Sequence, residues 1–276
     1  MLAARPEIKG RGKKEKIMFE EFKGKVLFVT GAASGMGRNV AVRFGSLGCK
    51  VAVTARKPEK AEETVRLVKE AGGEAMYVYC DISDEESVKK AVEETVAAYG
   101  AIDYAFNNAG CGADGVNVPF APLSEVEEKD WLRVINTNLT GTFHCLKYEL
   151  KQMQKQGGGA IVNTSSIGGL KMAPAFGAYG PSKAGVNALT MLAATENGRA
   201  GIRVNAICPG PTEGTNLMAD SVSSGNQDVE FMKANVIPDG KMGTTDNIAD
   251  AVVFLMSEMA SHITGELLPV CGGMQM

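Results

Sequence analysis

The sequence of 276 residues has few of the side chains that build metal centres, and its cysteines form no pattern. It holds two histidines, His144 and His262, and six cysteines without a C-x-x-C pair. Ligands this far apart do not suggest a zinc site. Scattered cysteines in a chain of this size are typical of reduced thiols in a reducing compartment. We therefore expect no metal cofactor, no disulfide framework and a cytoplasmic protein.

Long hydrophobic runs and an excess of one charge are also missing. No stretch of roughly 18 or more apolar residues is present, which predicts that the chain does not span a membrane. Lys and Arg number 29 against 32 Asp and Glu, so the basic excess of a nucleic-acid binder is absent. With 45% apolar and 22% charged residues, the composition is that of a globular protein with a sizeable core.

Basic residues gather near the N-terminus. Residues 1–16 hold six Lys or Arg against Glu7 and Glu15, and no apolar segment of a secretory signal follows. We expect residues 1–20 to form a disordered, solvated tail. Residues 21–276 are expected to form a single domain.

Short apolar runs alternate with longer helical patterns from residue 25 onward. Seven runs are predicted to be strands: 26–30, 51–54, 75–80, 102–107, 160–165, 203–208 and 267–270. Six segments have helical spacing: 37–47, 58–71, 84–99, 124–156, 182–198 and 246–257. Ser83, Ser124 and Pro58 are predicted to begin three of these helices. This alternation predicts an α/β fold, a doubly wound Rossmann-type parallel sheet of about seven strands with helices on both faces.

Residues 211–245 form the one long stretch without a predicted strand, which is typical of a lid or binding segment. Its large apolar side chains are Leu217, Met218, Val222, Val229, Phe231, Met232, Val236, Ile237 and Met242. Methionines make adaptable apolar linings, so these residues are compatible with a bulky apolar ligand. The simpler interpretation, that they pack a lid helix against the domain, is the favoured one.

A glycine-rich turn, TGAASGMG at residues 30–37, follows the first predicted strand. Glycines let the backbone turn tightly and approach a pyrophosphate, whose charge a helix N-terminus stabilises. The spacing G-x-x-x-G-x-G differs from the commoner dinucleotide fingerprint, and no P-loop lysine follows. The candidate cofactor-binding residues in this turn are Gly31, Ser34, Gly35, Met36 and Gly37.

The end of the second predicted strand bears on the choice of cofactor. An NAD-preferring site places an acidic residue here to bind the ribose hydroxyls. The sequence instead reads VTARK, and no acid appears before Glu59. Arg56 can pair with a 2′-phosphate, so NADP(H) is favoured over NAD(H). An ordinary surface arginine is the alternative interpretation.

Two further motifs carry polar groups. The sequence NNAG at residues 107–110 ends the fourth predicted strand, where ligands bind in open α/β sheets. Tyr179 and Lys183 lie at a predicted helix start, and their spacing places them on one helical face. Pro181 lies between them, so this proline must be in the first turn of the helix, where proline is tolerated. A neighbouring ammonium, a helix N-terminus and an oxidised nicotinamide would each favour a phenolate, so Tyr179 is a candidate acid–base with a lowered pKa.

Together, TGxxxGxG, NNAG and S-x12-Y-x3-K resemble the compact, single-domain branch of the short-chain dehydrogenase/reductase family, over residues 25–273. The resemblance implies a catalytic set of Asn138, Ser166, Tyr179 and Lys183. It implies cofactor contacts, besides the glycine turn and Arg56, from Asp81, Ile82, Asn108, Ala109, Gly110, Tyr179, Lys183, Pro209, Gly210 and Thr212. One departure is Gly214, which stands where the family usually has a threonine.

The resemblance also implies reversible hydride transfer between a nicotinamide and a secondary alcohol or ketone. Met172 and Phe176 lie between the catalytic serine and tyrosine in the sequence. These apolar side chains are also compatible with a bulky apolar substrate such as a hydroxysteroid or bile acid. A 3-oxoacyl-thioester reductase and a sugar or polyol dehydrogenase are alternatives. An NAD(P)-binding regulatory protein of this fold would be expected to have lost Tyr179 or Lys183. The family further implies a homotetramer or homodimer built from the helices predicted at 124–156 and 182–198.

Overall fold

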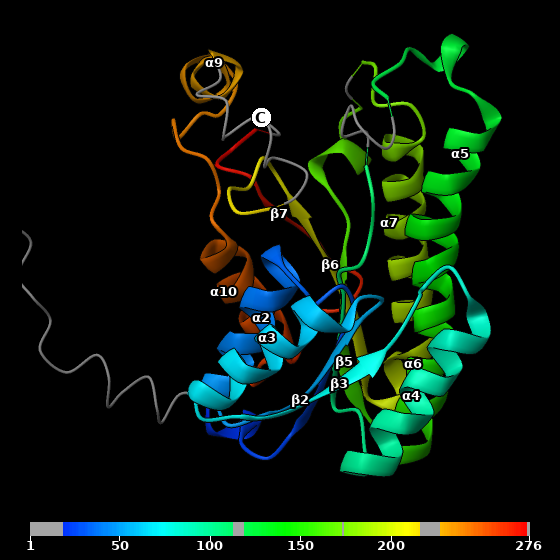
Figure 1. The fold of residues 1–276 in the computed structure, drawn as a ribbon, viewed down its shortest axis with the longest axis vertical. Helices are drawn as coiled ribbons and strands as arrows, with labels where there is room; N and C mark the ends of the chain where they lie inside the picture. The colour runs from blue at the N-terminus through cyan, green and yellow to red at the C-terminus, as the bar shows by residue number, and fades with distance from the viewer. Residues whose placement is uncertain (1–18, 113–118, 173, 216–226, 275–276) are drawn as a thin grey trace, which may run out of the picture.

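The computed structural model describes residues 19–112, 119–172, 174–215 and 227–274 (Figure 1). Within these residues, seven parallel strands form one sheet in the order β3-β2-β1-β4-β5-β6-β7. The strands are β1 (Val26–Val29), β2 (Lys50–Ala55), β3 (Glu74–Tyr79), β4 (Tyr104–Asn107), β5 (Gly159–Thr164), β6 (Ile202–Pro209) and β7 (Leu267–Val270). The predicted doubly wound sheet is confirmed. Each strand begins and ends within two residues of its predicted bounds.

Helices cover both faces of the sheet (Figure 1). One side carries α2 (Gly35–Ser46), α3 (Pro58–Glu70) and α10 (Thr245–Met256), and the other carries α4 (Glu85–Tyr99), α6 (Gly141–Gln156) and α7 (Tyr179–Asn197). Within β1, Leu27 packs into the core with α2, whereas Phe28 packs into the core with α4. Neighbouring residues of a strand point to opposite faces, so a strand between two helical layers is apolar throughout.

Two of the predicted helix starts were wrong. Pro58 is the first residue of α3, as expected. Ser83, however, does not cap α4, because Asp84 is the N-cap and its carboxylate accepts a hydrogen bond from the first turn. Ser83 instead binds the carboxylate two residues before it. Ser124 lies inside the short 3-10 helix η2 (Leu123–Glu125) and caps nothing.

The single helix predicted over residues 124–156 is interrupted. Val126 is extended after η2, and α5 (Glu128–Ile135) then leads through the π-helical segment η3 (Asn136–Thr140) into α6. A π-helical turn contains one residue more than an α-helical turn, and hydrophobic spacing does not reveal the insertion. The insertion lies at one of the predicted catalytic positions, Asn138.

The segment 211–245 contains α9 (Gln227–Asn235), at the same end of the molecule as α5 (Figure 1). The two ends of the segment are joined, because Gly243 donates a backbone hydrogen bond to Pro211 and its carbonyl accepts one from Glu213. A small cluster holds the segment together: Val229, Met232, Ile237, Met242 and Met274. This packing agrees with the favoured interpretation. Leu217, Met218 and Val222 lie outside the described residues.

None of the six cysteines forms a disulfide bond in the structure. None of the helices in the described ranges has the length and apolar character needed to cross a bilayer. The tail predicted at residues 1–20 lies almost wholly outside the described residues, so it stays a prediction.

Candidate active site

The glycine turn and the NNAG turn are bound together at the point where the strand order reverses, between β1 and β4. Thr30 Oγ1 accepts hydrogen bonds from the amides of Asn108 (3.0 Å) and Ala109 (3.1 Å). The side-chain amide of Asn108 donates to the carbonyls of Thr30 (3.2 Å) and Gly31 (3.3 Å). Asn108 was predicted to contact a cofactor, but here its side-chain nitrogen holds the turn. In doubly wound sheets, ligands bind at this switch point.

Close backbone contacts explain the glycines. A Cβ on Gly31, whose φ is +65°, would lie 2.8 Å from Ala109 Cα. A Cβ on Gly37 would lie 2.5 Å from the carbonyl oxygen of Gly31. Ser34, the N-cap of α2, makes no side-chain capping bond to the first turn, and Met36 is the second helical residue. This narrow cradle at a helix N-terminus fits the pyrophosphate of a dinucleotide.

The predicted adenine-ribose side of the cradle is more exposed. Arg56 directly follows β2, its side chain is 72% exposed, and Nη1 lies 3.9 Å from Asp81 Oδ2. Ile82 is buried, and it packs closely against Gly141 at the start of α6. Arg56 and Asp81 therefore face solvent together, while the Ile82 side chain belongs to the core.

Tyr179 and Lys183 lie on the first two turns of α7, with Pro181 in the first turn as required. Lys183 is 5% exposed, and its Nζ lies 5.7 Å from the centroid of the Tyr179 ring. The same ammonium donates a hydrogen bond of 2.8 Å to the carbonyl of Thr164 at the end of β5. The pair is thus held between α7 and β5.

Burial controls the protonation of this pair. Burial lowers the pKa of Lys183 to about 8. It raises the pKa of Tyr179, although a hydrogen bond with Ser166 opposes the rise. In the protein alone, burial therefore opposes the lowered phenol pKa expected from the sequence, because it removes the phenolate from water.

Ser166 faces the phenol from the loop after β5. It is 8% exposed, and its Oγ accepts a hydrogen bond of 3.0 Å from the amide of Gly168. Its neighbour Ser165 donates instead to the carbonyl of Lys183 (3.1 Å). The structure thus brings Ser166, Tyr179 and Lys183 together.

Asn138 is buried, and its side chain links two other elements. Nδ2 donates to the carbonyl of Cys111 (2.8 Å) and to Ser182 Oγ (3.0 Å), and Oδ1 accepts from the amide of Cys111 (2.8 Å). A Cβ on Gly110 would lie 3.1 Å from Asn138 Oδ1. Sequence reasoning missed Cys111 and Ser182, because no motif or spacing relates them to Asn138.

The loop after β6 covers the glycine turn. Pro209 ends β6, and buried Thr212 donates a hydrogen bond of 2.9 Å to the carbonyl of Gly210. Gly214 has a φ of +76°, a conformation that threonine rarely adopts, which explains the departure from the family pattern. A Cβ on Gly35 would lie 3.4 Å from the carbonyl oxygen of Gly214. The loop and the turn are therefore in contact.

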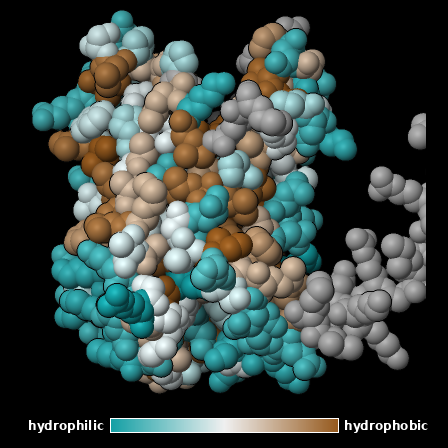
Figure 2. All heavy atoms as spheres, turned by 180° about the vertical axis from the view of Figure 1, so that it is seen from behind, coloured by the Kyte–Doolittle hydropathy of each residue, from teal (hydrophilic) through white to brown (hydrophobic). Residues whose placement is uncertain are grey.

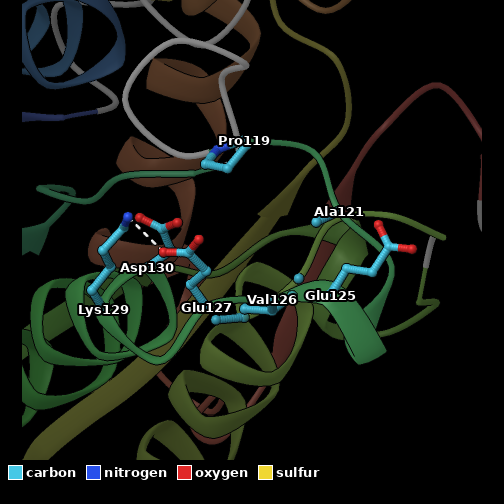
Figure 3. Close-up of a pocket in the computed structure, with 9 residues that line it drawn as sticks. Pro119, Ala121, Glu125, Val126, Glu127, Lys129 and Asp130 are labelled. Carbon is cyan, nitrogen blue, oxygen red and sulfur yellow. Dashed lines mark ion pairs between the residues drawn. The ribbon is translucent and has the colours of Figure 1, made fainter.

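A pocket of about 340 Å³ lies between residues 119–130 and the segment that precedes Tyr179 in the sequence (Figure 3). Its lining residues are Pro119, Ala121, Glu125, Val126, Glu127, Lys129, Asp130, Gly177 and Ala178. Glu127 and Asp130 lie with Lys129 on one side, whereas Glu125 points away (Figure 3). Lys129 forms an ion pair with Glu127 at 2.5 Å. Carboxylates therefore outnumber cations in the lining.

Aromatic side chains continue from the phenol toward this pocket. The ring centroid of Phe176 lies 6.3 Å from that of Tyr179, and Phe120 packs edge-on against Phe176 at 5.5 Å. Phe120 is 54% exposed and Met172 is 56% exposed. Seen from behind, the molecule is notched between two upper projections, and hydrophobic residues gather in the middle and upper part of this face (Figure 2).

Residues 31–275 match the family model described as enoyl-(acyl carrier protein) reductase. The chain belongs to the short-chain dehydrogenase/reductase family. It is 39% identical over 253 residues to an uncharacterized oxidoreductase of Thermotoga maritima, covering 91% of this chain and 98% of that protein. It is 35% identical over 269 residues to a 3beta-hydroxysteroid dehydrogenase of Mediterraneibacter gnavus, covering 91% and 95%.

Among solved structures, an NAD+-bound xylitol dehydrogenase superposes with a TM-score of 0.85 at 36% identity, covering 92% of this chain and all of that one. This short-chain dehydrogenase/reductase is therefore an oxidoreductase of a family that binds NAD(P). The resemblance carried by its motifs is confirmed.

Proposed function

We propose that this enzyme transfers hydride between NADP(H) and a secondary alcohol or ketone on a bulky, neutral, apolar molecule such as a hydroxysteroid. The observation that carries the substrate proposal is the aromatic pair beside the phenol. Phe176 and Phe120 extend outward from Tyr179, and Phe120 is half-exposed. Aromatic faces of this size bind apolar rings favourably.

The proposed chemistry uses Tyr179 and Ser166 on one substrate oxygen. The nicotinamide, when bound, supplies the hydride for reduction or accepts it in oxidation. In reduction, the phenol of Tyr179 donates a proton to the carbonyl oxygen, and Ser166 donates a hydrogen bond that stabilises its growing negative charge. The raised pKa of Tyr179 suits this direction, since it keeps the phenol protonated.

Lys183 and Asn138 are assigned supporting roles. The ammonium of Lys183, fixed by the Thr164 carbonyl, is positioned to stabilise the phenolate left after proton donation and to hold the nicotinamide ribose. Because the pKa of Lys183 is about 8, this residue can also pass a proton near neutral pH. Asn138 is proposed to support a water in the proton relay, from a position set by Cys111 and Ser182.

The cofactor is proposed to lie along the switch point. The residues assigned to it are Gly31, Ser34, Gly35, Met36, Gly37, Arg56, Asp81, Ile82, Asn108, Ala109, Gly110, Tyr179, Lys183, Pro209, Gly210 and Thr212. Arg56 supports NADP(H), because it is exposed at the end of β2 with one weak partner at 3.9 Å. The NAD+-bound xylitol dehydrogenase keeps NAD(H) as the alternative to be tested.

The charge of the pocket supports a neutral substrate. Glu127 and Asp130, whose two negative charges the single Lys129 only partly balances, would repel a phosphate-bearing thioester or a bile-acid carboxylate that passed them. A polyol, as in the xylitol dehydrogenase neighbour, would leave the faces of Phe120 and Phe176 uncovered. Neutral hydroxysteroids therefore come first, and oxoacyl thioesters and polyols are the alternatives. Residues 211–245 are proposed to act as the lid over this substrate.

The test follows the absorbance of the reduced nicotinamide while the protein is offered hydroxysteroids, bile acids, polyols and hydroxyacyl thioesters, each with NADP and with NAD. Turnover of neutral hydroxysteroids with NADP is expected. Turnover confined to thioesters or polyols would overturn the substrate proposal. Turnover with NAD alone would overturn the role of Arg56.

A homotetramer or homodimer is proposed through the outer faces of α6 and α7, which pack on one another. These helices expose Phe143, Met191 and Leu192 by 46%, 46% and 54%. Large apolar side chains gathered on adjacent helices favour association. Light scattering is expected to give a mass of two or four chains, and a Leu192→Glu variant is expected to dissociate. A monomeric wild-type protein would contradict this assembly.

A further inference from the structure

A chain of buried polar side chains runs across strands β4 and β5 on the face of the sheet that α6 and α7 cover, and none of these residues has a role in the proposed chemistry. Glu149 on α6 is fully buried, and its Oε2 accepts a hydrogen bond of 2.8 Å from Asn107 Nδ2. Asn107 also donates to Asn163 Oδ1 (3.0 Å), and Asn163 donates to Thr190 Oγ1 on α7 (2.9 Å). Four side chains thus join α6, β4, β5 and α7.

Two oxygen atoms of this chain lack a hydrogen-bond partner among the described residues. They are Glu149 Oε1 and Asn107 Oδ1, which belong to the same hydrogen-bonded pair. An ionised Glu149 brings no donor to this pair. A protonated Glu149 brings one donor, and it also avoids leaving a full charge in the core.

The surroundings of Glu149 supply no compensating positive charge. The charge of an ionised Glu149 acts on two buried thiols, Cys145 on α6 and Cys80 after β3, and raises the pKa of both. The face of α4 that packs toward the core carries uncharged residues, from Ser87 to Thr95. On β6, Arg203 is occupied by carbonyls at the end of α10, on the other face of the sheet. Lys183 lies two helical turns before Thr190 on α7, and its ammonium binds the carbonyl of Thr164.

We propose that Glu149 is a positioning residue that acts in its protonated form, holding the ends of β4 and β5 in register with α7 through Asn107, Asn163 and Thr190. The residues next to the chain are site residues. Asn108, which follows Asn107, ties the glycine turn, and Thr164, which follows Asn163, accepts the hydrogen bond of Lys183. Thr190 lies two helical turns after Lys183, on the same side of α7.

The burial of Glu149 makes the stability of the folded protein depend on pH. Burial raises the pKa of Glu149 from 4.5 to about 7, and the hydrogen bond from Asn107 only partly opposes this. Because the folded protein holds this proton more tightly than the unfolded chain, the contribution to stability is complete below about pH 4.5 and is lost as the pH rises to about 7. Above that pH, the loss stays constant.

The first experiment compares thermal unfolding of the wild type, Glu149→Gln and Glu94→Gln across the neutral range. A glutamine keeps the acceptor for Asn107 Nδ2, adds a donor and cannot ionise. Between about pH 5.5 and about pH 8, the wild-type Tm is expected to fall roughly 5 °C more than that of Glu149→Gln. Glu94, an exposed glutamate on α4, is the matched control and should follow the wild type. Equal pH slopes for the wild type and Glu149→Gln would overturn the proposal.

The second experiment separates positioning from general stability, and it rests on the proposed cofactor binding. The affinity for NADPH is measured by fluorescence titration. It is expected to weaken about tenfold in Glu149→Ala and to stay within about twofold in Glu149→Gln. The wild-type affinity should also fall as the pH passes about 7, while that of Glu149→Gln should not.

A Glu149→Ala protein with a lower Tm but unchanged affinity would overturn the positioning role. If that variant does not fold, the pH dependence of affinity in the wild type and Glu149→Gln decides the same question. Unfolding needs no cofactor, so a wild type that bound no nicotinamide would contradict the proposed function alone. The thermal comparison would still decide whether Glu149 carries the proton.

Discussion

The proposed cofactor side and the proposed substrate side of this site are built by different means. On the cofactor side, backbone atoms approach so closely that Cβ atoms on Gly31 or Gly37 would lie within 3 Å of their neighbours. On the substrate side, half-exposed side chains such as Phe120 and Met172 project from loops. The first arrangement tolerates almost no substitution, whereas the second can change its ligand by changing a few side chains.

The residues between these two sides take their properties from burial. Lys183 and Tyr179 both have pKa values displaced toward the neutral form, because their environment is poor in water. Lys183 binds the Thr164 carbonyl at the end of β5, and Tyr179 contacts Phe176 on the proposed substrate side. Substitutions on the two sides should therefore cause losses of turnover and of cofactor affinity that can be told apart.

The largest expected effect comes from Tyr179→Phe, at the boundary. Loss of the proton donor should lower kcat about 1,000-fold, while cofactor affinity stays within about twofold, because the hydroxyl alone is removed. Steady-state kinetics and fluorescence titration measure the two quantities. Tyr148→Phe is the matched control, since that hydroxyl binds Glu85 on the outer side of α6. Equal turnover in Tyr179→Phe and the wild type would refute the catalytic assignment.

The next largest effect is expected on the cofactor side, from Gly37→Ala. The added Cβ would lie 2.5 Å from the Gly31 carbonyl oxygen, so the turn must move. We expect a loss of about 2 kcal/mol in the free energy of unfolding and roughly 100-fold weaker cofactor binding. Denaturant unfolding and titration check both values.

Gly198→Ala supplies the control for that substitution. No atom lies within 4 Å of a Cβ built at Gly198, and its φ is not positive. Its stability should change by less than about 0.5 kcal/mol. Similar losses in the two variants would mean that glycine acts through backbone freedom rather than through the close contact.

A smaller and more selective effect is expected from Arg56→Ala. If Arg56 binds the 2′-phosphate, affinity for NADPH should fall about tenfold while affinity for NADH stays within about twofold. Lys57→Ala, which removes the adjacent exposed cation, should change neither affinity. An equal loss of affinity for NADPH and NADH would show that Arg56 does not determine cofactor specificity.

The smallest effect is expected on the substrate side, from Phe176→Ala. Removing one ring should raise the KM for an apolar ketone about fivefold, because the substrate loses one aromatic contact. The affinity for the cofactor should be unchanged. Met259→Ala, which truncates an exposed apolar residue after α10, is the control. A change in cofactor affinity as large as the change in KM would show that Phe176 does not act on the substrate alone.

Some features of the fold and the site could be predicted from the sequence, and others could not. The strands, the glycine turn and the spacing of Ser166, Tyr179 and Lys183 were predicted, since each depends on residues close together along the chain. The broken helix before Asn138 was missed, because a π-helical turn leaves no mark in hydrophobic spacing. Ser83 was misassigned as a cap because Asp84 competes for the same amides.

The amino-acid sequence by itself determined the doubly wound sheet and which chemical groups stand at its carboxyl edge, because periodicity and glycine sterics act locally. Only the tertiary structure decided what those groups contact. Asn138 binds Cys111, 27 residues away, and Asn107 binds Glu149, 42 residues away. The protonation of Tyr179, Lys183 and Glu149 likewise depends on how much water packing removes. Burial is a property of the whole fold, and residue spacing does not encode it.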